Sequence, residues 1–150
     1  MRANEPYKGA TIDIFIRANS LKYPTKEEYI SRIRADVYRR LALQNPQIII
    51  LKADAEVSSR KSIIEDIDAV NKAFANLKER NRQHIIDAVK EVYFPYKGRR
   101  YIPRDVYKER VLACATKNYT TPQSVNNWLR EARMLCAYYK GLTVTEQEHI

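Results

Sequence analysis

Glycine occurs only 3 times in the 150 residues of this chain, and proline occurs 6 times. Tight β-hairpins rely on glycine for backbone conformations with positive φ, so a chain this poor in glycine has few of them. Every proline falls where a helix is expected to begin or end for other reasons, as suits a residue that is poorly tolerated inside helices. The sequence therefore predicts an all-α fold, and its length is sufficient to bury a core without a metal or a disulfide.

The first helix that periodicity predicts runs over about residues 26–43, where apolar residues recur at helical spacing. Thr25 and Glu28 have the spacing of a capping box at its start. Residues 45–57 are ambiguous, because the aliphatic run at 48–51 suits either a short buried strand or the start of a helix. We treat this segment as a connection.

The strongest helical pattern covers about residues 60–77, where an unbroken apolar stripe lies on one face. Ser62 and Glu65 offer a second capping box there. After the polar sequence ERNRQ a further amphipathic helix follows, and Asn81 is the expected cap. Long amphipathic helices therefore precede the last third of the chain.

The last third begins with FPYKGRRYIPR, a basic and aromatic loop at residues 94–104. A short helix is expected at about 104–116 and a final one at 122–140. Thr121 followed by proline is a specific helix start, and Gly141 suits a left-handed stop. We divide the chain into three parts. Residues 1–57 are an N-terminal helical region with the connection, residues 58–142 are a helical core that ends in these last two helices, and residues 143–150 are a flexible tail.

The formal net charge is +9, and it is uneven. Residues 76–150 hold 14 Lys and Arg against 8 Asp and Glu, which points to a polyanionic partner for that half. Cys114 and Cys136 have no ligand-spaced neighbours and fit small core residues in a reducing compartment. The chain shows neither a signal peptide nor a membrane-spanning run, so we expect a soluble, cytoplasmic protein.

The segment Thr121 to Leu135, TPQSVNNWLREARML, holds the only tryptophan. At 100° per residue, Val125, Trp128 and Leu129 share the side that faces the core. The opposite side carries side chains that can read base edges, since Asn and Gln pair with adenine and Arg with guanine. These base-reading candidates are Gln123, Ser124, Asn126, Asn127 and Arg130.

The two last helices are joined by about four residues, in which Asn118 could adopt the positive φ that glycine often supplies. This spacing fits a C-terminal helix-turn-helix that binds double-stranded DNA. Residues in and beside the preceding elements would then contact phosphates. The candidates are Lys97, Arg99, Arg100, Arg104, Lys108, Lys117, Tyr119 and Thr121.

No constellation of catalytic or metal-binding residues stands out. Glu65, Asp66 and Asp68 are so close in sequence that they point in different directions around a helix. His84 and His149 lack partners for a zinc site or a charge relay, and both are expected at the surface. We therefore expect no enzymatic activity, no cofactor and no metal.

In the order of these elements the chain resembles the RinA/ArpU-type phage transcriptional activators. The resemblance covers about residues 20–142 and rests on three segments: LKYPTKEEYISRIRADV, SIIEDIDAVNKAFANLKERNRQHIIDAVKEVYF and TPQSVNNWLREARML. The segment VYKERVLACATKNY is longer and more charged than its counterpart in the family. The resemblance implies a helix-turn-helix like that of sigma-factor region 4, activation of phage late or packaging genes, and recruitment of host RNA polymerase.

One alternative from a different class is a helical structural, assembly or packaging-adaptor protein of a phage. Such a protein would form homo-oligomers and show little preference among DNA sequences. Met134 fits this alternative, because helical spacing places it on the same outward face as Asn127, where it could contact another chain or a neighbouring helix.

Overall fold

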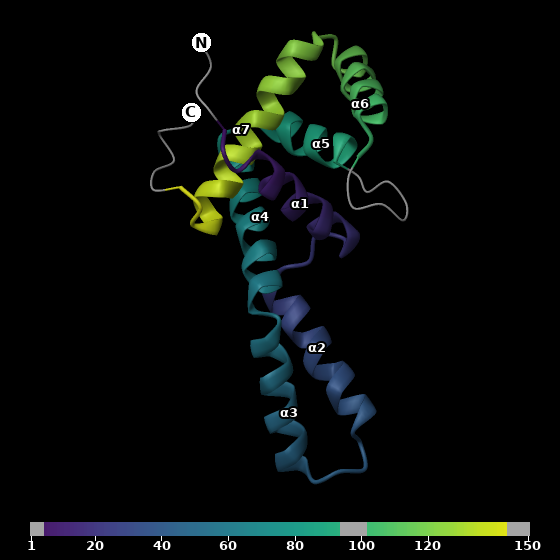
Figure 1. Cartoon of the computed structure of the whole chain (residues 1–150), viewed down its shortest axis with the longest axis vertical. Helices are drawn as coiled ribbons and strands as arrows, with labels where there is room; N and C mark the ends of the chain where they lie inside the picture. Colours follow the sequence, from purple (N-terminus) through teal and green to yellow (C-terminus); the bar gives the residue numbers. More distant parts are fainter. Residues whose placement is uncertain (1–4, 94–101, 144–150) are drawn as a thin grey trace.

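The computed structural model of the chain describes residues 5–93 and 102–143. These residues form seven α-helices and no strand, which confirms the all-α class (Figure 1). The helices are α1 (Lys8–Ser20), α2 (Lys26–Arg40), α3 (Pro46–Ser59), α4 (Lys61–Glu79), α5 (Gln83–Val92), α6 (Arg104–Lys117) and α7 (Pro122–Lys140).

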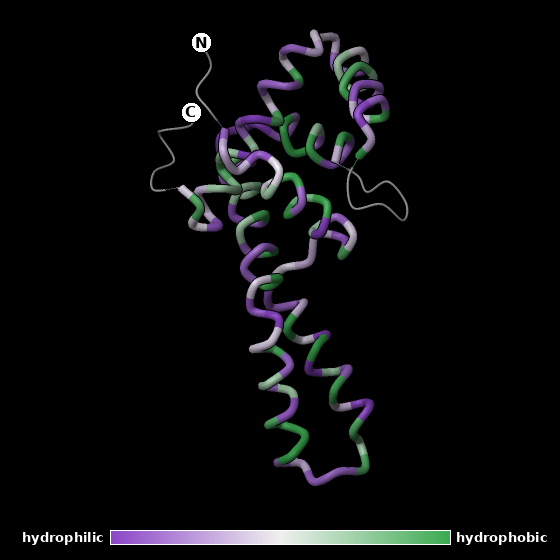
Figure 2. The backbone as a smooth tube through the Cα atoms, viewed as in Figure 1, coloured by the Kyte–Doolittle hydropathy of each residue, from purple (hydrophilic) through white to green (hydrophobic). Residues whose placement is uncertain are grey.

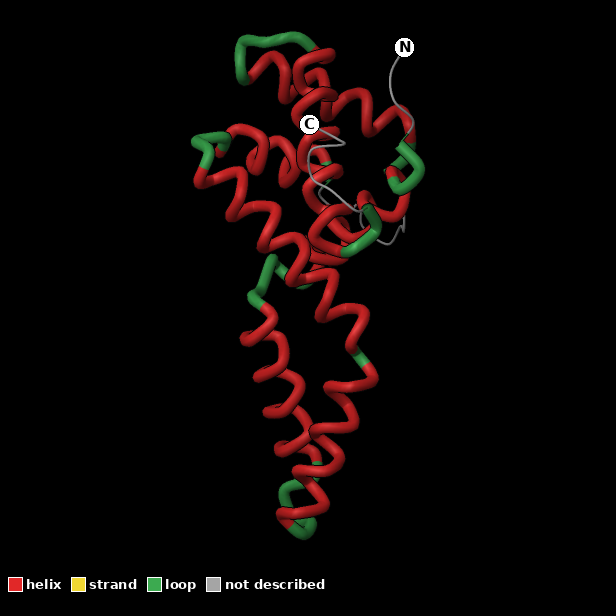
Figure 3. Tube along the Cα trace, turned by 90° about the vertical axis from the view of Figure 1, so that its left-hand side faces the viewer, coloured by secondary structure: helices red, strands yellow, loops and turns green. Residues whose placement is uncertain are grey.

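The helices are arranged as a body and an arm (Figures 1 and 3). The body consists of α1, α4, α5, α6 and α7, which pack around one core. The arm, residues 26–59, consists of α2 and α3, which lie side by side in opposite directions and extend away from the body. Only Arg60 separates α3 from α4, so the arm continues almost directly into a central helix of the body.

The apolar stripe predicted for residues 60–77 supplies a central part of the core. Val70 and Leu77 of α4 are buried, and α4 packs along α7. Phe15 stacks between Phe74 and Tyr93, with ring centroids 6.0 and 5.8 Å apart. A smaller apolar cluster joins the arm to the body, where Tyr29 and Ile33 of α2 pack with Ile67 of α4.

Helix α1 was not predicted from the sequence. Its apolar residues come almost in a run, Ile12 to Ile16, and Tyr7 at the N-cap position makes no side-chain capping bond. Tertiary packing holds it instead, because Phe15 is fully buried between α4 and α5 side chains. The sequence placed a boundary between residues 57 and 58. Helix α1 precedes that boundary and still contributes to the body core.

The treatment of residues 45–57 as a connection was wrong, since Pro46–Ser59 is helix α3. The start signal is the one that helices commonly use: the Asn45 side chain accepts a hydrogen bond from the Gln47 amide at 2.8 Å, and Pro46 is the first helical residue. The aliphatic run at 48–51 conceals the helical period. Only Ala53 of this helix is buried.

The capping predictions had mixed outcomes. The capping box of Thr25 and Glu28 is confirmed, with bonds of 3.1 and 3.3 Å. The box predicted at Ser62 is wrong, because α4 begins at Lys61 directly after α3 and needs no separate start. Asn81 does not cap α5 either; it has φ of 59° and ends α4, where the following amide donates to the Leu77 carbonyl.

Asp66 is the polar residue that ties the body together. It is 4% exposed and accepts from Arg17 of α1 at 2.6 Å and from Lys140 of α7 at 2.7 Å. Glu65 and Asp68 lie farther out on α4, as their separate directions predicted. The buried carboxylate therefore joins three helices rather than forming a pair with another acid.

Both cysteines are free and buried, as predicted for small core residues. Burial raises the pKa of the Cys114 thiol to about 11 and that of the Cys136 thiol to about 12. Neither thiol is ionised near neutral pH, so both are chemically inert there.

Candidate nucleic-acid interface

Helices α6 and α7 pack against each other and are joined by residues 118–121. The left-handed residue in this turn is Tyr119, with φ of 54°, whereas Asn118 has φ of −98°, contrary to the prediction for it. Asn118 instead ends α6 by donating its side-chain amide to the Cys114 carbonyl at 2.8 Å. The Thr120 amide completes the stop by donating to the Ala115 carbonyl.

The start of α7 is confirmed as predicted. The Thr121 hydroxyl accepts a hydrogen bond from the Ser124 amide at 3.1 Å, and Pro122 occupies the first helical position. At the other end Gly141 has φ of 86° and closes the helix in the left-handed conformation. These local interactions thus define where α7 begins and ends.

The buried side of α7 also agrees with the prediction, except at its aromatic residue. Val125 and Leu129 are fully buried in the body core. Trp128 is only half-buried and lies edge-on against His84, with ring centroids 4.7 Å apart. His84 is therefore not simply a surface residue; burial, with help from the charge of Arg82, lowers its pKa.

The base-reading candidates occupy the outward side of the first half of α7. Gln123 and Asn127 are exposed, while Arg130 is half-buried. Asn126 accepts a hydrogen bond from the Tyr107 hydroxyl of α6 at 3.3 Å, and Ser124 accepts one from the Thr121 hydroxyl. Ser124 and Asn126 are therefore at the edges of this surface, where they already make contacts within the protein.

The outward side of α7 does not remain open along the whole helix. One turn beyond Arg130, Arg133 and Met134 are 5% and 3% exposed, because the N-terminal segment with Glu5 and Tyr7 covers them. Met134 was expected to contact either another chain or a neighbouring helix. The first possibility is wrong, because Met134 is buried and lines a cavity with the N-terminal segment and Thr11 of α1. The open surface of α7 is therefore limited to about residues 122–130.

Two arginines that sequence reasoning missed lie beside this surface. Glu131 of α7 accepts from Arg80 at 3.3 Å and from Arg82 at 3.0 Å, both from the turn between α4 and α5. The side chain of each arginine is more than a third exposed. The sequence ERNRQ was interpreted only as a polar break. That its arginines lie beside α7 could not be predicted, because this depends on how the turn packs against that helix.

The predicted phosphate-binding residues fall into separate places. Arg104 and Lys108 are exposed one turn apart on α6, and Tyr119 and Thr121 are exposed in the turn before α7. Lys117 lies on another side of α6, where it lines a groove with Asp87 and Glu91 of α5. Three further candidates lie outside the described residues: Lys97, Arg99 and Arg100.

Within residues 5–93 and 102–143 there is no group of three or more His, Cys, Asp or Glu side chains that could hold a metal ion. None of the described helices is long and apolar enough to cross a membrane. Comparison with known proteins returned no relative: no protein-family model matches the chain, and no curated protein or solved structure matches it significantly.

Proposed function

We propose that this protein is a sequence-specific DNA-binding transcriptional activator that reads the major groove with the first half of α7. In this proposal α6 and α7 act as a helix-turn-helix, and α7 is the recognition helix. Base edges would be read by Gln123, Asn127 and Arg130, with Ser124 and Asn126 at the edges of the contact.

One observation carries the proposal: α7 is open to solvent along one side of its first half and covered along the same side of its second half. Helix-turn-helix proteins read bases with the N-terminal residues of the recognition helix, so only this part needs to be free. Burial of Val125 and Leu129 turns Gln123, Asn127 and Arg130 outward together. An Asn, a Gln and an Arg are the side chains suited to that task.

Cationic side chains on the neighbouring elements support the same proposal. Arg80 and Arg82 are held beside α7 through Glu131. α6 adds Arg104 and Lys108, which are exposed. Cations near a recognition helix can contact the phosphates that border the groove.

The test is duplex binding measured by fluorescence anisotropy, after selection of preferred sites from random DNA. Asn127→Ala and Arg130→Ala should each reduce the preference for the selected site by about 1–3 kcal/mol while weak binding to random duplex persists. Arg39→Ala, which removes an exposed arginine from the arm, is the matched control and should bind as the parent does. A parent that selects no sequence would refute the proposal.

The resemblance to RinA/ArpU-type phage activators extends the proposal to late or packaging gene promoters and to recruitment of bacterial RNA polymerase. Transcription in vitro from a promoter with the selected site is the measurement. The parent should raise the yield of transcript, and Arg130→Ala should not. If the parent binds DNA but does not raise the yield of transcript, the proposal of DNA binding stands and the proposal of transcriptional activation is refuted.

A further inference from the structure

A chain of side-chain contacts runs through the body from the N-terminal segment to the first half of α7. It begins at the buried ion pair of Glu5 and Arg133, whose guanidinium donates to the Tyr93 hydroxyl at 2.8 Å. Tyr107 of α6 stacks on Tyr93, with ring centroids 6.3 Å apart, and the two hydroxyls interact with each other. The Tyr107 hydroxyl then donates to Oδ1 of Asn126 at 3.3 Å. A base-reading candidate is therefore connected to a buried cation.

The chemistry of these groups sets the direction of the contacts. A guanidinium can only donate, so Arg133 uses the Tyr93 oxygen as an acceptor and leaves the phenolic proton of Tyr93 to another partner. Tyr93 is fully buried, and a buried donor needs an acceptor, which the neighbouring Tyr107 hydroxyl provides. Burial raises the pKa of Tyr93 most, the Arg133 charge opposes this rise and Tyr107 adds to it, so Tyr93 keeps its proton. The donors therefore point from Arg133 toward Asn126.

The last of these bonds determines which end of the Asn126 amide faces outward. An asparagine amide carries an acceptor oxygen and a donor nitrogen on two arms of one planar group. Because Oδ1 accepts from Tyr107 within the protein, the Nδ2 group faces away from Tyr107. Val125 and Leu129 hold the buried side of α7, and Figure 2 shows hydrophilic and hydrophobic stretches alternating along its first half. Asn126 thus offers donors at the edge of the open surface.

We propose that Tyr107 is a positioning residue that restricts Asn126 to bases with an acceptor on their major-groove edge. Guanine presents two acceptors there and thymine presents one, whereas cytosine presents only a donor. Asn126 therefore favours guanine and disfavours cytosine at the base that it contacts. An amide free to rotate would instead offer a donor and an acceptor together, which is the pattern that adenine matches. This inference rests on the proposed function, since it concerns how α7 reads bases.

The test uses the full chain and the duplex that it selects from random DNA, with each of the four bases placed in turn at every position of the site. Asn126→Ala identifies the base that Asn126 contacts, because the preference should be lost at that position alone. There the parent should bind guanine about tenfold more tightly than cytosine. Tyr107→Phe keeps the stacked ring and removes the hydroxyl, so the preference at this position should move from guanine to adenine.

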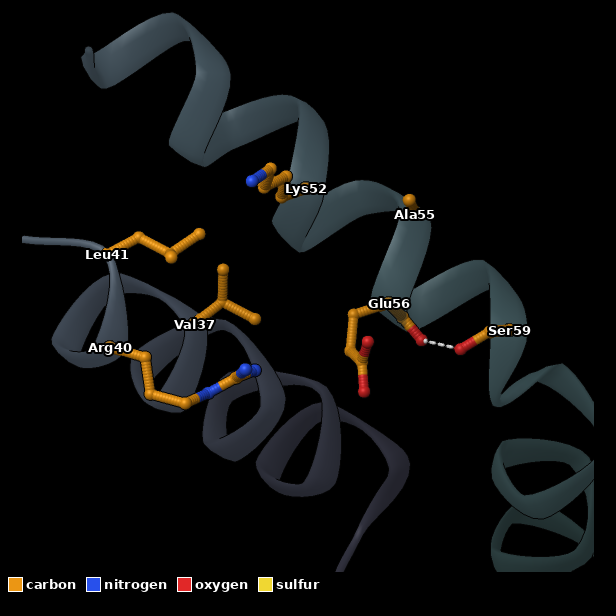
Figure 4. A pocket seen from close by; sticks show the side chains of 7 residues that line it. All are labelled: Val37, Arg40, Leu41, Lys52, Ala55, Glu56 and Ser59. Atoms are coloured by element: carbon orange, nitrogen blue, oxygen red, sulfur yellow. Dashed lines mark hydrogen bonds between the residues drawn. The ribbon is translucent and has the colours of Figure 1, made fainter. Parts of the chain in front are cut away.

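Two further variants sharpen the test. Asn126→Asp still accepts from Tyr107 and turns a second oxygen outward, so the preferred base should become cytosine, whose amino group donates to a carboxylate. Ser59→Ala is the matched control for the loss of a hydroxyl. The Ser59 hydroxyl also donates to a carbonyl oxygen, that of Glu56 at 2.7 Å, but it lies on the arm (Figure 4). This control should leave every preference unchanged, and unchanged circular dichroism shows that each variant is folded.

The outcomes separate this inference from the proposed function. If Asn126→Ala changes no preference, or if Tyr107→Phe leaves guanine preferred, the inference is overturned while recognition by the other side chains of α7 stands. A loss of preference at all positions in Tyr107→Phe also overturns it, since Tyr107 would then support α7 as a whole rather than Asn126. A parent that selects no sequence overturns the proposed function and this inference together.

Discussion

Glu5 and Arg133 form a two-point ion pair, with distances of 2.6 and 2.9 Å, that joins the N-terminal segment to α7 across 128 residues of sequence. Arg133 also donates to the Tyr93 hydroxyl at 2.8 Å. The pair is largely buried, with the two side chains 6% and 14% exposed. It is the contact that covers the second half of α7 and limits the open surface to the first half.

Removal of one partner of this pair should destabilise the fold strongly. Glu5→Gln leaves the guanidinium of Arg133 buried without its countercharge, for which we expect a loss of about 3–5 kcal/mol in the free energy of unfolding. Asp36→Asn is the matched control, because Asp36 pairs with exposed arginines on the arm and should cost at most about 1 kcal/mol. Urea titration followed by circular dichroism gives both values. If both variants lose the same free energy of unfolding, the buried pair stabilises the fold no more than an exposed one.

The contact between His84 and Trp128 should make the body sensitive to acid. Burial first, and then Arg82, lowers the pKa of His84 in the folded protein, so the folded state favours the neutral imidazole. This contribution to stability is fully present above the ordinary pKa of about 6.5 and is lost as the pH falls through the lower folded value.

The only tryptophan of the chain reports on this change directly. Titration of Trp128 fluorescence should give a midpoint below pH about 6.5, because a protonated imidazole in edge contact quenches the indole. His84→Gln should abolish the transition. His149→Gln, which changes the other histidine, should leave it unchanged. A midpoint above the ordinary value would contradict the burial of His84.

Arg80 and Arg82 should contribute to DNA binding without affecting sequence preference. The double variant Arg80→Gln with Arg82→Gln should weaken binding to every duplex and reduce the slope of log K against log salt by about 2. The control is Arg39→Gln with Arg40→Gln, because these two arginines also share one carboxylate, that of Asp36, but lie on the arm. Anisotropy titrations at several salt concentrations provide the slopes. If both double variants reduce the slope equally, the arginines act through net charge alone.

Substitution of Tyr119 should affect the stability of the fold and the binding of DNA in opposite directions. It has φ of 54° and a side chain that is 99% exposed, so Tyr119→Gly relieves backbone strain and should stabilise the fold by up to about 1 kcal/mol. If the ring contacts the DNA backbone, the same variant should bind duplex more weakly. Thermal unfolding and duplex titration of one sample measure both effects. Stronger DNA binding by the variant would count against a phosphate contact at this position.

Local signals in the sequence determined much of the helical framework. The capping box at Thr25, the Thr121 and Pro122 start and the Gly141 stop act through neighbouring residues, so their outcomes could be predicted without the fold. The same holds for the buried side of α7, because helical periodicity alone assigns Val125 and Leu129 to the core. Helices α1 and α3 escaped prediction where contiguous aliphatic residues concealed the helical period.

Only the tertiary structure decided how much of α7 is available to a partner. Periodicity placed Met134 on the same side as Asn127, but Glu5 and its neighbours return from the far end of the sequence and cover Met134. The positions of Arg80 and Arg82 beside α7 likewise follow from a contact with Glu131 some fifty residues away. A helical period reports which side of a helix faces a core, whereas the segment that covers the opposite side depends on long-range packing that no local pattern encodes.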